Sequence, residues 1–199
     1  LYDNVDVDQR WCLVHATHAN ADEVQLMAQS KAVAGLCLTT EANLGDGIFP
    51  AVDYLAQGGR MGIGSDSHVS LSVVEELRWL EYGQRLRDQR RNRMYRSDQP
   101  MVGRTLYDAA LAGGAQAMGQ PVAGLAVGQR ADWLVLDGND PYLATAQDDA
   151  ILNRWLFAGG DRQIRNVMVN GQWVVRDGHH ADEEASCRDF TRVLRELLG

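Results

Sequence analysis

Three short apolar runs, each followed by a segment with helical spacing, organise roughly the first 119 residues of the chain. The runs cover residues 11–14, 35–39 and 61–64. Short buried strands that alternate with helical segments are typical of parallel βα units. We therefore expect three strands of one parallel sheet, with their carboxyl ends along the same edge.

Helical patterns fill the gaps between these strands. Residues 21–30 are expected to form a helix with Asn20 or Asp22 as its N-cap, and residues 51–57 a second helix that ends at a glycine pair. Residues 40–50 are too polar and too rich in glycine to be regular, and long loops of this kind are usually functional. The apolar face of the first helix is formed by Val24, Met27 and Ala28.

A longer helix is expected after the third strand. Ser70 or Ser72 can cap its first turn, and Glu81 lies four positions before Arg85, which is the spacing of an ion pair along a helix. We expect this helix to pack on the outside of a barrel. Its apolar face is expected to carry Val73, Leu77 and Leu80.

A basic run follows this helix. Because cations near the carboxyl end of a helix complement its dipole, we interpret the run as a solvated helix end rather than as a nucleic-acid contact. A shorter helix is then expected from Thr105 to the glycines at 113–114, with one further turn over residues 115–118. The run comprises Arg85, Arg87, Arg90, Arg91, Arg93 and Arg96.

The pattern changes after Gly119. Residues 127–137 indicate a turn followed by a strand, and residues 164–175 indicate a hairpin around the Asn170-Gly171 pair, because Asn-Gly between alternating β-formers is a strong hairpin signal. Residues 185–197 are expected to form a final helix. Its apolar face is formed by Phe190, Val193, Leu194 and Leu197.

Composition narrows the class of protein. The length of 199 residues allows one large or two small domains, and the hydrophobic content of 45% is that of an ordinary globular protein. No run approaches the roughly eighteen apolar residues of a membrane span, and the first residues lack the basic start of a signal peptide. We therefore expect a soluble, cytoplasmic protein without a membrane partner.

Charge and cysteine content exclude further classes. The formal net charge of −8 argues against general nucleic-acid affinity, so we expect no nucleic-acid partner. The chain has three cysteines, an odd number without metal-site spacing, and two of them lie within apolar runs. A disulfide framework is therefore not expected. The cysteines are Cys12, Cys37 and Cys187.

The strand ends carry the residues of greatest chemical interest. Asp66 follows the run at 61–64 in a polar turn, and His15 follows the run at 11–14. Active sites of βα barrels gather at the carboxyl ends of the strands, so these side chains are expected to share one pocket. Both residue types are zinc ligands. The simpler alternatives are a helix cap or Asx-turn for Asp66 and a core histidine for His15.

Several motifs resemble those of the amidohydrolase superfamily. Leu-Val-His-Ala-Thr-His at 13–18 is similar to the end of barrel strand six, and Gly-Ile-Gly-Ser-Asp-Ser-His at 62–68 to the metal-binding end of strand eight. Gly-Gln-Arg-Ala-Asp at 128–132 and Val-Asn-Gly at 169–171 are similar to the closing sandwich. Two longer strings, at 40–47 and from 67 into 76–85, resemble the formimidoylglutamate deiminases within this superfamily.

The resemblance implies an α/β fold. Residues 1–119 would form the carboxyl-terminal half of a distorted TIM-like (β/α)8 barrel, comprising strands six to eight and their helices. Residues 120–182 would form a segment of a small β-sandwich domain, and residues 183–199 a terminal helix. It also implies zinc-dependent hydrolysis of N-formimino-L-glutamate in histidine degradation, a small-molecule substrate, and a homodimer.

The resemblance further assigns roles to single residues. One zinc ion is implied, with Asp66 as its only ligand from this chain and as general acid and base. His15 would hold the attacking water, or alternatively bind the metal directly. His68 and Glu41 are candidates for contacting substrate or supporting the site, and each could equally shape its own turn. His18 is assigned no role, since it could cap backbone as readily as touch substrate.

Two departures from the family pattern limit this interpretation. Related chlorohydrolases and nucleobase deaminases carry Pro-Thr-Ser-Asn after strand seven, whereas Leu-Thr-Thr-Glu stands at 38–41, which argues against a ring deaminase. The His-x-His of strand one and the His of strand five, with a Glu three residues beyond, do not occur in this sequence. Three strands also cannot close an eight-stranded barrel. We therefore expect the chain to be a fragment of a longer enzyme or one product of a split polypeptide, completed by its amino-terminal half.

Two other functions remain open from the sequence. The same fold and metal could serve a deaminase for another amidine, a guanidine or an aminated ring. The chain could also be a binding module that kept the barrel and lost its chemistry. A substrate panel separates the first alternative, and metal analysis separates the second.

Overall fold

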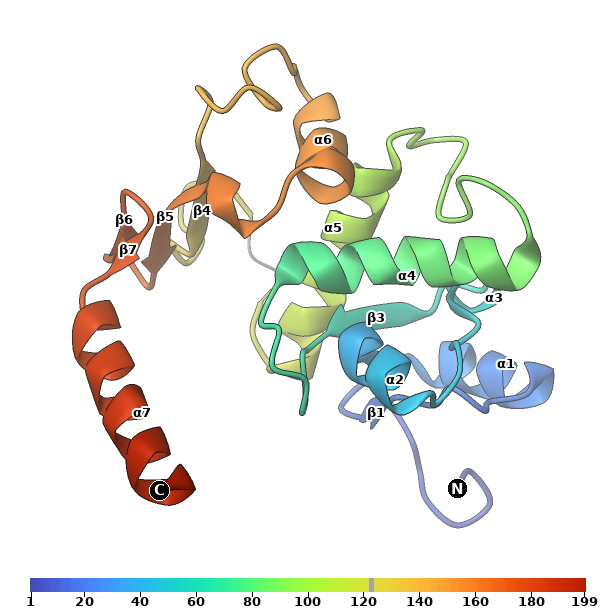
Figure 1. Ribbon diagram of the computed structural model, residues 1–199. Coiled ribbons are helices and arrows are strands. Elements are labelled where there is room, and N and C mark those ends of the chain that lie inside the picture. Colours follow the sequence, from blue (N-terminus) through green and yellow to red (C-terminus); the bar gives the residue numbers. More distant parts are fainter. Residues whose placement is uncertain (122–123) are drawn as a thin grey trace.

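The computed structural model describes residues 1–121 and 124–199, and it contains two sheets with helices around them (Figure 1). The first sheet has three parallel strands in the order β1-β2-β3, and the second has four antiparallel strands in the order β4-β5-β6-β7. The strands of the first sheet are β1 (Cys12–Val14), β2 (Val33–Leu36) and β3 (Arg60–Ile63). This arrangement confirms the three parallel strands expected from the sequence.

Register places the strand ends side by side. Val14 pairs with Gly35 and Gly35 pairs with Gly62, so the three strands finish at nearly the same level. The ladder extends one residue further on each side, because the amide of His15 donates to the carbonyl of Gly35 over 2.8 Å and the amide of Gly64 donates to Leu36 over 3.0 Å. The residues that follow β1 and β3 therefore emerge at one edge of the sheet.

The middle strand is followed by a helix rather than by the irregular loop expected at 40–50. Strand β2 lies at Val33–Leu36, earlier than the expected 35–39, and α2 (Leu38–Leu44) begins two residues later. Buried carboxylates on Glu41 and Glu76 accept the free amides at its start, and Gly45 ends it with φ of 72°. The expectation of an irregular loop was wrong at residues 40–44. One of the carboxylates that stabilise the helix start, Glu76, lies far along the chain, so the local sequence does not reveal it.

The first helices follow the expected bounds. Helix α1 (Ala21–Ser30) begins with a capping box, in which Asn20 accepts from the amide of Glu23 and Glu23 accepts from the amide of Asn20. Helix α3 (Ala51–Ala56) ends just before the glycine pair. Residues 45–50, between α2 and α3, are irregular as expected.

Helix α4 (Val73–Asp88) packs against α2, α3 and β3 and contributes several buried side chains to the core. Ser72 caps it by accepting from the amide of Glu75. Glu81 and Arg85 form the expected ion pair at 2.6 Å. The expected apolar face is correct for Leu77 and Leu80, but Val73 is exposed and its neighbour Val74 is buried instead. The buried face therefore begins at Val74 and continues at a spacing of three residues through Leu77 and Leu80.

Helix α5 (Val102–Ala117) runs without interruption through the glycines at which the sequence predicted an end. An alanine Cβ at Gly113 would lie 1.8 Å from the carbonyl oxygen of Met61, so the helix backbone touches β3 directly. Gly114 has open space at the same point. Gly113 is therefore a packing residue, and its lack of a side chain does not mark a helix end.

The core lies between the parallel sheet and the helices that cover it. Helices α4 and α5 both contact β3, and α6 (Ala150–Ala158), which the sequence did not predict, packs against both helices. The largest buried apolar side chains come from all of these elements: Leu36, Phe49, Tyr54, Met61, Leu77, Leu80, Leu106, Trp155 and Leu156. The carboxyl-terminal segment thus contributes to the same core as the βα units.

The second sheet contains the expected hairpin. Strands β5 (Ile164–Val169) and β6 (Gln172–Arg176) pair around Asn170 and Gly171, whose φ angles are 49° and 79°. Strand β4 (Trp133–Leu136) pairs with β5 on its other side. A short strand, β7 (His179–His180), pairs with β6, and both of its histidines are exposed.

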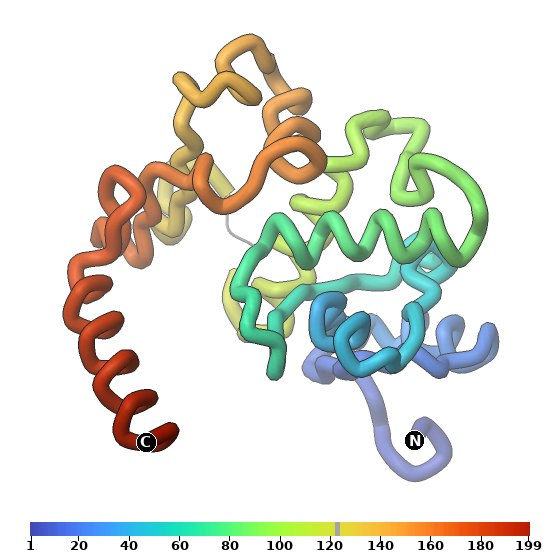
Figure 2. The backbone as a smooth tube through the Cα atoms, in the orientation of Figure 1, coloured from blue at the N-terminus to red at the C-terminus, as the bar shows by residue number. Residues whose placement is uncertain are grey.

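The chain ends in α7 (Glu183–Leu198), which stands apart from the rest of the molecule (Figures 1 and 2). Its apolar face is present as expected but is exposed along the whole helix. Among the described residues, no helix combines the length and the apolar character that a bilayer crossing requires. The division of the chain at residues 119 and 182 stays a prediction.

The contact between α5 and β3 gives a stability prediction with a built-in control. Gly113→Ala is expected to lower the free energy of unfolding by at least about 3 kcal/mol, because its methyl group overlaps the Met61 carbonyl. Gly114→Ala is expected to raise it by roughly 0.5–1 kcal/mol, because alanine favours the helix and the site is open. Urea unfolding of the two variants measures both values. Equal effects would contradict this packing.

Candidate active site

His15 and Asp66 come together at the carboxyl edge of the parallel sheet. His15 directly follows β1, and Asp66 lies three residues after β3. The Nε2 atom of His15 is 3.8 Å from an Oδ atom of Asp66, although the residues are far apart in the chain. The side chain of His15 is 37% exposed and that of Asp66 is 45% exposed, so both are accessible to a ligand. The sequence prediction that they share one pocket agrees with this geometry.

Both residues adopt a backbone conformation that is uncommon for side-chain-bearing residues. His15 has φ of 65° and Asp66 has φ of 52°, and Ala16 beside His15 has φ of 49°. Left-handed conformations of such residues cost about 1–2 kcal/mol each and gather at functional sites. The structure turns sharply after β1 and after β3, and each turn aims a polar side chain at the space above the sheet edge.

Helix α2 contacts the turn after β1 through Glu41. Oε1 of Glu41 lies 3.2 Å from Nδ1 of His15 and accepts the amide of Cys37 over 2.9 Å. Glu41 is buried, with 2% exposure. Its other oxygen, Oε2, is also buried and has no hydrogen-bond partner among the residues that the structure describes. Glu41 therefore holds the histidine ring from the side opposite Asp66.

A second residue of α2 holds the turn that carries Asp66. The hydroxyl of Thr40 donates to the carbonyl of Ser65 over 2.6 Å and accepts the amide of His68 over 3.0 Å. Thr40 is almost fully buried. Adjacent residues of one short helix thus fix the two loops that present His15 and Asp66.

The site is surrounded by carboxyl groups. Burial raises the pKa of Glu41, while the amide of Cys37 and the ring of His15 act in the opposite direction. Burial also raises the pKa of Glu76, against the hydrogen bonds from Thr39. Together with Asp66, these carboxylates form a negative environment that suits a cationic ligand.

The donor set at the sheet edge fits a metal through Asp66 and, by geometry, through His15. His15, Cys37 and Glu41 also place one ligand atom each within 4.8 Å of the others. However, burial, followed by the charges of Glu41, Asp66 and Glu76, raises the pKa of the Cys37 thiol to about 12. Metals bind the thiolate, so this cluster of three is a poor metal site at neutral pH.

The other residues considered from the sequence are not all part of this arrangement. Glu41 is in contact with His15, as described. His68 makes local contacts, in which its Nδ1 accepts the amide of Ser70 over 3.1 Å. His18 is exposed. The two histidines of β7 lie in the second sheet, and all three cysteines are free thiols.

Sequence reasoning missed the residues that support the site. Thr40 and Glu76 belong to the two longer strings that carry the family resemblance, but the sequence analysis gave neither residue a role of its own. Glu76 is buried and accepts both the amide and the hydroxyl of Thr39. A glutamate on the same side of the helix as the buried Leu77 and Leu80 was the available signal, because an unpaired carboxylate is rarely buried.

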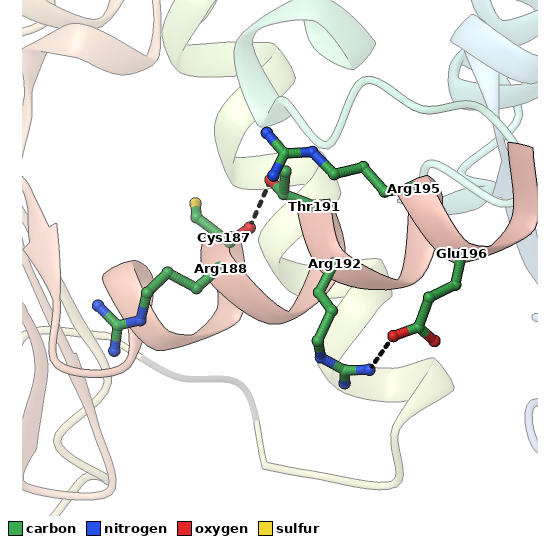
Figure 3. Close-up of a pocket in the computed structure, with 6 residues that line it drawn as sticks. All are labelled: Cys187, Arg188, Thr191, Arg192, Arg195 and Glu196. Carbon is green, nitrogen blue, oxygen red and sulfur yellow. Dashed lines mark hydrogen bonds and ion pairs between the residues drawn. The ribbon is translucent and has the colours of Figure 1, made fainter. Parts of the chain in front are cut away.

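Two hollows lie elsewhere in the described part of the chain, and neither includes the pair at the sheet edge. A groove of about 900 Å³ lies at the amino-terminal end of β3, between α3, α5 and residues 93–99. A shallow hollow runs along α7 (Figure 3), where Thr191 donates to the carbonyl of Cys187 and Arg192 pairs with Glu196. All residues lining the second hollow belong to one helix, so no groups from different elements converge there.

Comparison with known proteins bears on these findings. The model of the amidohydrolase family matches residues 4–174. A curated formimidoylglutamate deiminase from Pseudomonas aeruginosa is 80% identical over 198 residues, which cover 100% of this chain and 44% of that protein. A 5-methylthioadenosine/S-adenosylhomocysteine deaminase from Natronomonas pharaonis is 26% identical, over 97% of this chain and 44% of its own length. The chain thus spans less than half the length of these relatives.

Solved structures agree in fold. An amidohydrolase from Brucella melitensis superposes with a TM-score of 0.93 at 44% identity, covering 100% of this chain and 44% of that one. An adenosine deaminase from Xanthomonas campestris with bound zinc has a TM-score of 0.82 at 21% identity, over 96% of this chain and 43% of its own. The second likeness concerns the fold alone.

The strained turn after β3 generates a prediction that is independent of activity. Asp66→Gly is expected to be more stable than Asp66→Ala by about 1 kcal/mol, because only glycine adopts this φ without strain. Both variants lack the carboxylate, so their difference isolates the backbone. Ser67 provides the control, since its φ is not positive and Ser67→Gly should gain nothing over Ser67→Ala. Equal urea midpoints for the two Asp66 variants would refute the strain.

Proposed function

Because the chain belongs to the amidohydrolase family, we propose that it forms the carboxyl-terminal half of an enzyme that hydrolyses N-formimino-L-glutamate to N-formyl-L-glutamate and ammonia. The observation that carries this proposal is the 80% identity to a formimidoylglutamate deiminase along the whole chain. The enzyme is a hydrolase of carbon–nitrogen bonds other than peptide bonds, with a place in histidine degradation.

The proposed cofactor is one zinc ion. Asp66 is its ligand from this chain, and three histidines outside the chain complete the set. The exposed carboxylate of Asp66 and the nearby Nε2 of His15 suit such an ion, because zinc prefers carboxylate oxygen and imidazole nitrogen. When bound, the ion lowers the pKa of a coordinated water to about 7 and so supplies hydroxide at neutral pH. The zinc in the adenosine deaminase structure supports the choice of metal within this fold.

Asp66 and His15 have different roles in the proposed reaction. Asp66 has a second oxygen that accepts the proton of the attacking water and passes it to the departing nitrogen. His15 holds that water through Nε2 and stabilises charge on the tetrahedral intermediate. A carbon–oxygen bond forms, the carbon–nitrogen bond breaks, and the nitrogen leaves as ammonia with the transferred proton. The second proton of the water is released as the carbonyl forms, and Asp66 passes it to solvent.

The electronegative edge of the sheet suits this substrate. The formimino group is an amidine and carries a positive charge when protonated, so Glu41, Glu76 and Asp66 favour its approach. The two carboxylates of the substrate call for arginine or other donors. We propose that the amino-terminal half of the enzyme supplies these donors, together with the strands that complete the barrel, and that the complete enzyme is a cytoplasmic homodimer.

The role of the two site residues is tested by metal content and turnover in the complete enzyme. Asp66→Ala is expected to abolish ammonia release and to weaken zinc binding, because it removes a ligand and the proton carrier. His15→Gln is expected to lower the turnover number by at least about 100-fold while zinc stays bound. Metal analysis and an ammonia assay measure both. Normal rates in both variants would exclude this assignment.

The substrate is tested by a panel of amidines and aminated rings. The wild-type enzyme is expected to release ammonia from N-formimino-L-glutamate and not from guanine or adenosine analogues. Removal of zinc by a chelator should stop the reaction, and its return should restore it. Release from a ring substrate alone would favour the ring-deaminase alternative. An enzyme without stoichiometric zinc, unaffected by Asp66→Asn, would favour a binding module.

A further inference from the structure

We propose that Glu41 is a positioning residue that fixes the tautomer and the orientation of the His15 ring. This proposal rests on the proposed function, because it concerns how His15 acts within that site. Glu41 itself contacts neither the reacting atoms nor the metal in this arrangement, and it acts through the histidine.

The hydrogen bond between the two residues determines which ring nitrogen is free. Oε1 of Glu41 lies 3.2 Å from Nδ1 of His15, and an ionised carboxylate is only an acceptor, so the ring proton resides on Nδ1. In a neutral imidazole, Nε2 is then the nitrogen without a proton. This second nitrogen faces Asp66 at 3.8 Å, on the exposed side of the ring where water and substrate arrive.

The contact with Glu41 matters because few other contacts restrain the His15 side chain. Its side chain is more than one-third exposed and follows a short strand in a left-handed turn. A free imidazole in such a place would rotate about its side-chain bonds and exchange tautomers. The partner, by contrast, is buried and is held by the amide of Cys37 over 2.9 Å, so its position is set before substrate binds.

The bonding of Glu41 is poor for stability alone. Two groups converge on Oε1, whereas Oε2 is buried without a partner among the described residues. An unsatisfied buried acceptor costs about 1–3 kcal/mol, and this cost is set against the two hydrogen bonds that Oε1 makes. An arrangement that leaves one oxygen bare while directing the other at a catalytic imidazole is explained by function.

Three carboxylate variants test the proposal in the complete enzyme. Glu41→Leu removes the acceptor, and Glu41→Gln keeps an acceptor oxygen, oriented by the Cys37 amide, but removes the charge. Glu81→Gln is the matched control, because Glu81 is also fully buried and accepts backbone amides, from Arg93 and Met94, but lies in α4 away from His15. Melting curves and zinc content show which variants remain folded and loaded.

Nitrogen NMR of ¹⁵N-histidine-labelled enzyme reads the tautomer directly, with the His15 signals identified by their loss in His15→Gln. Wild type, Glu41→Gln and the Glu81→Gln control are expected to show the Nδ1-protonated form. Glu41→Leu is expected to lose it. A wild-type ring protonated on Nε2, or an unchanged tautomer in a folded Glu41→Leu, overturns the proposal. If Glu41→Leu does not fold, the wild-type spectrum decides, because a ring protonated on Nε2 excludes the proposed tautomer.

Kinetics give the second measurement. Glu41→Leu is expected to lower kcat about 100-fold and Glu41→Gln about 10-fold, with KM changed less than threefold and zinc content unchanged, since partners of this kind are worth about 10- to 100-fold. Glu81→Gln should stay within twofold of wild type. A kcat within twofold of wild type in a folded, zinc-loaded Glu41→Leu overturns the proposal. The NMR measurement needs no substrate, so an enzyme inactive on N-formimino-L-glutamate but with the expected tautomers would refute the function and leave the positioning role standing.

Discussion

Two buried carboxylates hold the first turn of α2, and the geometry of the site depends on them. Glu41 accepts the amide of Cys37, and Glu76 on α4 accepts the amide of Thr39. The first amides of a helix have no partner within it, and here no side chain of the N-cap residue serves them. Burial raises the pKa of both carboxyl groups, because it disfavours their charged forms. Each carboxylate offsets part of this cost by accepting backbone amides that would otherwise be unsatisfied.

The position of α2 then explains how two strained turns persist. His15 and Asp66 both have positive φ, and neither turn is stabilised by a glycine at that point. On one side, backbone hydrogen bonds to the central strand β2 hold both turns. On the other side, α2 holds them through Glu41 and Thr40. Strain of this kind survives only where the surrounding contacts permit no relaxation. The same contacts bring the two side chains within 3.8 Å.

The sequence predicted those features that depend on nearby residues. The capping box of α1, the ion pair of α4 and the Asn170-Gly171 hairpin all act over a few positions, and each is present. The proximity of His15 and Asp66 was also predictable, because parallel strands end at one edge. Helix α2 and the full length of α5 were not, since one depends on Glu76, 37 residues away, and the other on a backbone contact with Met61. Such contacts leave no periodic signal.

The exposure of the site sets a requirement on the complete enzyme. At roughly two-fifths exposure, the charges of His15 and Asp66 are screened by water, which weakens the electrostatic stabilisation that the proposed chemistry needs. Both edge strands of the parallel sheet also lack a strand partner on their outer side within the described residues. Further strands that pair with β1 and β3 would also exclude water from the space around His15 and Asp66. Completion of the sheet would therefore strengthen the electrostatic interactions of the site at the same time. The Glu41 contact lies on the buried side of His15, so this chain can orient the His15–Asp66 pair before further strands are added.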